Sequence, residues 1–186
     1  MPKTLCWVIA ITAIVAPGLH LVSDVLEWVG GGFSHCQLLI NYMGFLPMPF
    51  LMLGLYAAQR PRIGWVGLLG SVLYGVAFIY FTHTTLYALE ESIPDYETLW
   101  RRLGGVYTFH GGLMVAGGVL FGLAALRAKV LWRSAVALFL IGIALNLVLG
   151  LLPLPDIVQT AGSAVRNLGL MGIGVGLMRS LGQKVS

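Results

Sequence analysis

The sequence predicts an all-α fold, a polytopic membrane helix bundle with six transmembrane helices and both termini in the cytoplasm. Three observations lead to this prediction. Hydrophobic residues make up 58% of the 186 residues and charged residues only 10%, where a soluble domain has roughly a quarter of its residues charged. The apolar residues come in repeated blocks of about 20 residues or more, the length that crosses the hydrocarbon core of a bilayer. Basic residues gather in alternate connections between these blocks.

The blocks are expected to be helices because every backbone polar group inside a bilayer must find its partner within the protein. Glycine and proline mark the breaks: GGGFSHC follows the first block, QRPRIG the second and LPLPD the fifth. One domain is the natural count for this length, so residues 1–186 are predicted to form a single transmembrane domain. The predicted spans are residues 4–29, 37–58, 63–88, 103–126, 131–152 and 157–179.

The distribution of Lys and Arg predicts the orientation. With a cytoplasmic N-terminus, Arg101 and Arg102 fall outside, Arg166 falls within a span, and the other basic residues lie at the inner ends of the helices. The positive-inside rule favours this N-in, C-in arrangement. It also accounts for an isoelectric point near 9.3 without a nucleic-acid partner. The basic residues at the inner ends are Lys3, Arg60, Arg62, Arg127, Lys129, Arg133, Arg179 and Lys184.

Three of the predicted helices carry polar residues at helical spacing. His20, Asp24 and Glu27 follow one another at i, i+4 and i+7, which places them on one face of the first span. At mid-bilayer a charged residue that faces lipid costs from about 2.5 kcal/mol upward. We therefore expect the three polar stripes to face one another. The other two stripes are Tyr80, His83, Tyr87 and Glu90 in the third span and Gln159, Ser163 and Arg166 in the sixth.

In the predicted topology the polar residues of all six spans lie in the outer half of the bilayer, and the cytoplasmic half is almost purely apolar. This coincidence in depth predicts a pocket that opens toward the outer leaflet or the outer aqueous space and takes a lipophilic small molecule. The candidate catalytic residues are His20, Asp24, Glu27, His83, Tyr87, His110 and Arg166. The candidate ligand-binding residues are Asn41, Tyr80, Tyr107, Asn146, Ser163 and Asn167.

The residue types of this polar layer favour a membrane-embedded enzyme or a cofactor-binding protein. His, Asp, Glu and Tyr supply general acids and bases, and a low dielectric shifts their proton affinities. A metal-assisted version would use His20, Asp24, His83 and His110 to hold zinc or iron, although no short metal signature such as HExxH occurs. A single haem b, held by His20 with His83 or His110, is a further alternative.

Two other classes of function stay open at the level of the sequence. A carrier or receptor is one, because intramembrane ionisable residues often mark ion or proton paths. An accessory subunit of a larger membrane complex, with a purely structural polar layer, is the other. The 25 glycines favour close packing of helices, within the bundle or across a homodimer. The small six-span layout resembles many bacterial multipass proteins, which implies the lipid bilayer of the bacterial cytoplasmic membrane as its surroundings.

Overall fold

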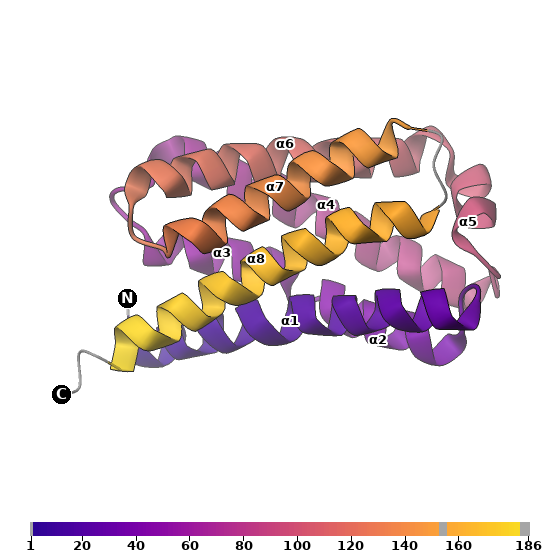
Figure 1. Cartoon of the computed structure of the whole chain (residues 1–186), viewed down its shortest axis with the longest axis horizontal. Helices are drawn as coiled ribbons and strands as arrows, with labels where there is room; N and C mark the ends of the chain where they lie inside the picture. The colour runs from indigo at the N-terminus through magenta and orange to yellow at the C-terminus, as the bar shows by residue number, and fades with distance from the viewer. Residues whose placement is uncertain (1, 153–155, 183–186) are drawn as a thin grey trace.

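The structure, a computed structural model, describes residues 2–152 and 156–182. All regular elements in this part of the chain are α-helices, which confirms the all-α prediction for these residues (Figure 1). The helices are α1 (Lys3–Gly30), α2 (His35–Phe45), α3 (Met48–Ala58), α4 (Gly64–Glu90), α5 (Tyr96–Leu103), α6 (Gly105–Ala128), α7 (Arg133–Gly150) and α8 (Asp156–Gly182).

Five helical stretches are long and apolar enough to cross a membrane, which indicates an integral membrane protein. They are α1, α4, α6, α7 and the pair α2–α3 taken together, His35–Ala58. α8 is as long as α4, at 27 residues each, but it is not one of the five. It is more polar, and its Arg166 and Asn167 are buried inside the bundle. The count of six spans and the N-in, C-in orientation therefore stay predictions.

The second predicted span, 37–58, is two helices in the structure. α2 ends at Phe45 and α3 begins at Met48, with Leu46 and Pro47 between them. Pro47 and Pro49 lack the backbone N–H that a continuous helix needs, which accounts for the break. The predicted loop before the fourth span also differs, because it contains the short helix α5.

The long helices run antiparallel along the bundle, and both chain ends lie at the end opposite α5 (Figure 1). The most extensive helix contacts join α7 to α8, α4 to α6 and α1 to α8. Glycine allows the α4–α6 contact: a Cβ at Gly70 would collide with the backbone of Phe121, and a Cβ at Gly117 with the backbone of Tyr74. The two backbones can lie this close only because neither glycine has a side chain.

An apolar core fills the half of the bundle that holds the chain ends. It includes aromatic rings from three long helices, since Tyr74, Phe121 and Phe139 pack against one another there. Side chains from the turns of that end complete it. Other core members in this half are Ile9, Met52, Leu55, Ile63, Ala128, Leu131, Val136 and Ile173.

Candidate functional site

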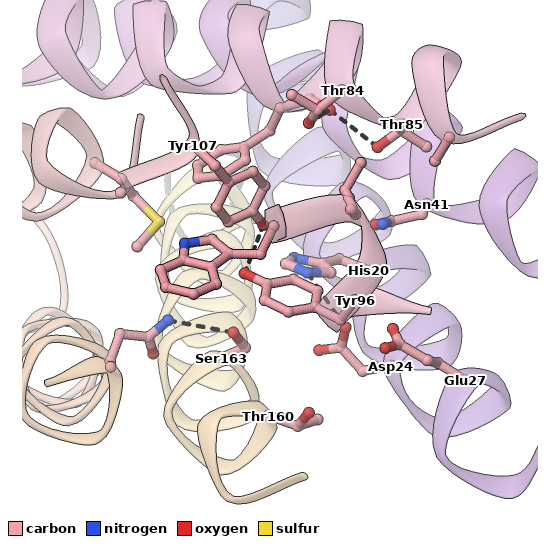
Figure 2. A pocket seen from close by; sticks show the side chains of 18 of the residues that line it. His20, Asp24, Glu27, Asn41, Thr84, Thr85, Tyr96, Tyr107, Thr160 and Ser163 are labelled. Carbon is pink, nitrogen blue, oxygen red and sulfur yellow. Dashed lines mark hydrogen bonds and ion pairs between the residues drawn. The ribbon is translucent and has the colours of Figure 1, made fainter. Parts of the chain in front are cut away.

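A cavity of about 1020 Å³ occupies the other half of the bundle, at the end covered by α5. Its described lining comes from the late turns of α1, α4 and α7 and from the early turns of α2, α6 and α8. Figure 2 shows polar side chains from several of these helices gathered around it. The polar or charged residues of the lining are His20, Asp24, Glu27, Asn41, Thr84, Thr85, Asp95, Tyr96, Glu97, Tyr107, Thr108, Asn146, Thr160, Ser163 and Arg166.

One wall of the cavity holds a chain of polar contacts from α8 to α1. Nη2 of Arg166 lies 3.2 Å from Nδ1 of His20, and Nε2 of His20 lies 3.4 Å from Oδ1 of Asp24. A guanidinium has only donors, so Nδ1 of His20 must accept. The ring proton is therefore on Nε2, from where it points to Asp24. Both nitrogens of His20 are engaged, one toward each charge.

Arg166 is 2% exposed, although it lines the cavity. Its Nη1 donates to the thioether sulfur of Met114 at 2.8 Å, and its Cζ lies 5.8 Å from the ring centroid of Phe78. Its Nε has no hydrogen-bond partner among the described residues. Gly142 of α7 places it, because a Cβ there would collide with the backbone of Arg166. A buried guanidinium with a weak sulfur acceptor and an unused N–H is poorly compensated.

The first polar stripe has the geometry that its spacing predicts. His20, Asp24 and Glu27 all line the cavity from α1 (Figure 2). Two hydrogen bonds fix α2 beside them: Nε2 of Gln37 donates to Oγ of Ser23 at 2.8 Å, and that hydroxyl donates to the Gln37 carbonyl at 3.3 Å. These two hydrogen bonds therefore join α1 to α2 next to the stripe.

Two asparagines, Asn41 of α2 and Asn146 of α7, belong to other walls of the cavity. Nδ2 of Asn146 donates to Oγ of Ser163 at 3.2 Å, which joins α7 to α8. The Oδ1 atoms of Asn146 and Asn41 are buried and without a partner among the described residues, as is Oδ2 of Asp24. Three acceptors and the Nε of Arg166, all in residues of the lining, thus lack a hydrogen-bond partner among the described residues.

α5 covers the mouth of the cavity. The hydroxyl of Tyr96 donates to that of Tyr107 at 2.7 Å, and Leu99 packs into a small cluster with Leu38, Ala88 and Ile93. Oδ1 of Asp95 caps the helix by accepting from the Thr98 backbone N–H at 2.7 Å. This hydrogen bond lowers the pKa of Asp95 below its ordinary value of 3.8.

The second polar stripe turns away from the cavity. Tyr80 is 41% exposed, His83 is also exposed, and Tyr87 is half-buried near α5. None of the three lines the cavity, nor does His110, whose ring stacks on Tyr80 at 4.4 Å. Asn167 is fully buried and also outside the lining, and the side chain of Gln159 lies outside the described part of the structure.

The structure therefore does not assemble the ligand set predicted for a metal or a haem. His20 contacts Asp24. The rings of Phe45 and Phe81 lie between His20 and His110, each in contact with the next. Among the described residues, no group of three or more His, Cys, Asp and Glu side chains is placed to hold a metal ion. The polar side of α4 faces outward, which separates His83 from His20.

Sequence reasoning missed the side of α4 that does line the cavity. That side carries Phe78, Phe81, Thr85 and Ala88, which repeat at i, i+3, i+7 and i+10. The hydroxyls of Thr84 and Thr85 both donate to the Phe81 carbonyl at 2.9 Å, so each keeps acceptor capacity for a ligand. This spacing was visible in the sequence, but a stripe of Phe and Thr is also typical of ordinary packing. Thr160 and Tyr96 were missed as well.

Comparison of the chain with protein-family models, with curated proteins and with solved structures found no match.

Proposed function

We propose that this chain is an integral membrane protein that binds a lipophilic molecule in the cavity beneath α5 and holds the polar group of that molecule on Arg166. The buried guanidinium on the cavity wall is the observation that carries this proposal. Burying an ion costs several kcal/mol unless partners compensate for it. Among the described residues, the charged group linked to Arg166 is Asp24, and the His20 ring lies between the two. An acceptor group of a ligand beside the guanidinium would supply the compensation that the described residues do not.

The rest of the lining suits an apolar body. Phe45, Phe78 and Phe81 pack as a cluster beside Arg166, and Met114 lies on the opposite helix α6. The volume, about 1020 Å³, is at the upper end of the range for sites that enclose small molecules, roughly 300–1,000 Å³. Two exposed leucines, Leu147 of α7 and Leu151 just after it, also belong to the lining.

The shape of the cavity favours binding over conduction. Its described lining reaches no deeper along the helices than His20, Phe45, Phe78, Val115 and Arg166, and the apolar core occupies the bundle beyond them. A path for ions would need polar groups through that half as well. A cavity that is closed at its inner end supports a binding protein or a receptor more than a channel.

Acid–base catalysis on the bound molecule is the second candidate, and Asp24 favours it. Oδ2 of Asp24 is buried and without a partner among the described residues, so it could take a proton from a ligand. His20 is less suited to this role, because Arg166 and Asp24 already engage both ring nitrogens. Asp24→Asn separates the two candidates: turnover of a bound ligand is lost if Asp24 is the base, while binding through Arg166 remains.

Gly111 offers a direct test of the proposal. It lines the cavity, and a Cβ at this position meets nothing within 4 Å. Gly111→Leu should fill the space without disturbing the fold. Gly105→Leu is the matched control, since Gly105 lies on the same helix, has the same open surroundings and does not line the cavity.

The experiment is native mass spectrometry of the protein purified in a neutral maltoside detergent, with and without added hexadecyl phosphate or hexadecylphosphocholine. We expect the wild type and Gly105→Leu to carry one amphiphile and Gly111→Leu to lose it at an unchanged melting temperature. Equal occupancy in Gly111→Leu, or a wild type that takes up neither probe, overturns the proposal.

A further inference from the structure

Two turns at the end of the bundle that holds the chain ends carry five basic residues. The first turn joins α3 to α4, and the second joins α6 to α7 (Figure 1). Each of the five residues is within two positions of the end of a helical stretch that is long and apolar enough to cross a membrane. In a membrane this places their side chains at the level of the lipid headgroups. The five are Arg60, Arg62, Arg127, Lys129 and Arg133, all of them exposed.

The two turns lie side by side because α4 and α6 pack against each other in a fixed register. The helices are antiparallel, and a Cβ at Gly67 of α4 would touch the side chain of Ala124 of α6. Three residues further toward this end of the bundle, the same register places Gly64, the first residue of α4, level with Arg127. The basic residues just before Gly64 and just after Arg127 therefore border one surface, which we call the basic surface.

The basic surface has no acidic residue beside it in the chain. The sequence contains no Asp or Glu from residue 28 to residue 89 or from residue 98 to residue 155, and both turns lie within these ranges. The ion pairs among the described residues involve His20, Arg101 and Arg102, all toward the end covered by α5. Several like charges without a counter-charge produce a positive field that attracts an anion.

Two tryptophans indicate what kind of anion meets this surface. Trp65, in the first turn of α4, is 73% exposed and follows Arg62 by three residues. Trp132 is 49% exposed and directly precedes Arg133. Exposed tryptophans at the ends of membrane helices lie among the lipid headgroups. Basic side chains at the same level as these rings are therefore placed to meet a lipid headgroup.

We infer that the basic surface binds the headgroup of an anionic phospholipid in preference to that of a zwitterionic one. A phosphate oxygen accepts charge-assisted hydrogen bonds from a guanidinium. Each Lys or Arg beside an anionic lipid surface strengthens binding by about fivefold. The inference depends neither on the cavity nor on the side of the membrane that this end of the bundle faces.

Quenching of Trp65 by brominated lipids measures this preference locally. The reporter variant keeps Trp65 and has phenylalanine in place of the other four tryptophans. It is reconstituted into phosphatidylcholine vesicles that contain an increasing fraction of brominated phosphatidylglycerol, which is anionic. The same series with brominated phosphatidylcholine gives the quenching for a zwitterionic lipid. We expect the anionic lipid to bind beside Trp65 at least about fivefold more tightly than the zwitterionic one.

Two double variants of the reporter assign the preference to charge. Arg62→Gln with Arg127→Gln should lower it by about fivefold or more, because two positive charges are removed. Arg62→Lys with Arg127→Lys keeps both charges and should retain most of it. Arg101→Gln is the matched control, because Arg101 is an exposed arginine of α5 at the other end of the bundle, and the preference should stay unchanged.

Native mass spectrometry of the chain with all its tryptophans repeats the comparison. The protein is given an equal mixture of the two lipids, without bromine, and should retain more phosphatidylglycerol than phosphatidylcholine. The double glutamine variant should lose part of this excess. Melting temperatures of all variants confirm that they are folded.

Three results would overturn the inference. The first is equal quenching of Trp65 by the two brominated lipids. The second is a double glutamine variant that keeps the full preference in both measurements. The third is a double lysine variant that loses as much as the double glutamine variant, because the positive charge would then not be the cause.

Discussion

His20 joins two opposite charges that form no direct ion pair in the described structure. Arg166 donates to one side of its ring and Asp24 accepts from the other. Nδ1 faces the donor groups of Arg166, and Nε2 faces the carboxylate of Asp24. A histidine in a membrane helix is thus a connector here, and its two nitrogens are not equivalent.

Replacing the connector predicts a graded loss of stability. His20→Leu removes the described link between Arg166 and Asp24 and leaves the guanidinium without that acceptor, a change that typically costs about 1–3 kcal/mol or more. His20→Gln should cost less, because the amide oxygen can accept from Arg166 and the amide nitrogen can donate to Asp24. The melting temperature of the purified protein measures both variants. If both variants lower the melting temperature equally, the hydrogen bonds of His20 do not contribute to stability, and only the packing of its ring does.

The sequence predicts the residues of this contact on α1, but it does not predict which residues of the other helices lie beside them. The spacing of His20, Asp24 and Glu27 predicted one shared face, and the structure places all three on the cavity wall. The same logic placed His83 and Tyr80 inside, whereas they are exposed. His83 lies seven residues before the end of α4, about 10 Å. Near a helix end a polar side chain can reach the interface, so an outward orientation costs little.

At the scale of the element, α5 depends on its cap. The pKa of Asp95 is lowered by the hydrogen bond from Thr98, so the carboxylate stabilises the folded helix at every pH above its unfolded value and loses this effect as the pH falls through the folded pKa. We expect hydrogen exchange of the α5 amides to be constant at neutral pH and to rise below about pH 4.

Asp95→Asn is the control for that prediction, because asparagine also caps helices but does not titrate in this range. It should keep α5 protected and remove the change at low pH. Asp95→Ala should expose α5 at every pH, with a loss of about 1 kcal/mol in the helix. If hydrogen exchange of α5 rises at low pH in Asp95→Asn as it does in the wild type, a group other than Asp95 causes the rise.

The α4–α6 contact gives a second prediction at this scale. Gly117→Ala brings a Cβ against the backbone of Tyr74, where no rotamer change can relieve the collision, and should cost about 1–3 kcal/mol or more. Gly112→Ala, five residues earlier on α6, meets open space and should be neutral or stabilising, since alanine is favoured over glycine in helices by about 1 kcal/mol. Melting temperatures of the two variants in the same detergent should shift in opposite directions or differ strongly.

Helix ends were predictable to within a few residues, and the internal break was not. The predicted first span 4–29 is Lys3–Gly30, and the predicted fifth span 131–152 is Arg133–Gly150. Hydropathy detects where an apolar block stops, but the second block stays apolar through Pro47. The sequence predicts a loop where α5 lies, because eight residues are too few to span a membrane or to show a clear helical pattern of apolar residues.

At the scale of the whole molecule, topology is the prediction to test first. Cys36 is exposed at the start of α2, and Ser180 is exposed near the end of α8. If both termini are cytoplasmic, a membrane-impermeant maleimide should label Cys36 in intact cells. In a cysteine-free background, Ser180→Cys should react only after the cells are permeabilised. The reverse pattern would invert the orientation and move the cavity to the cytoplasmic side.

The apolar core fills the bundle below the cavity, and the short amphipathic helix α5 lies over the other end of the cavity. If a bound molecule enters and leaves beneath α5, a change that loosens α5 should raise the rates of loading and release together and shorten the residence time.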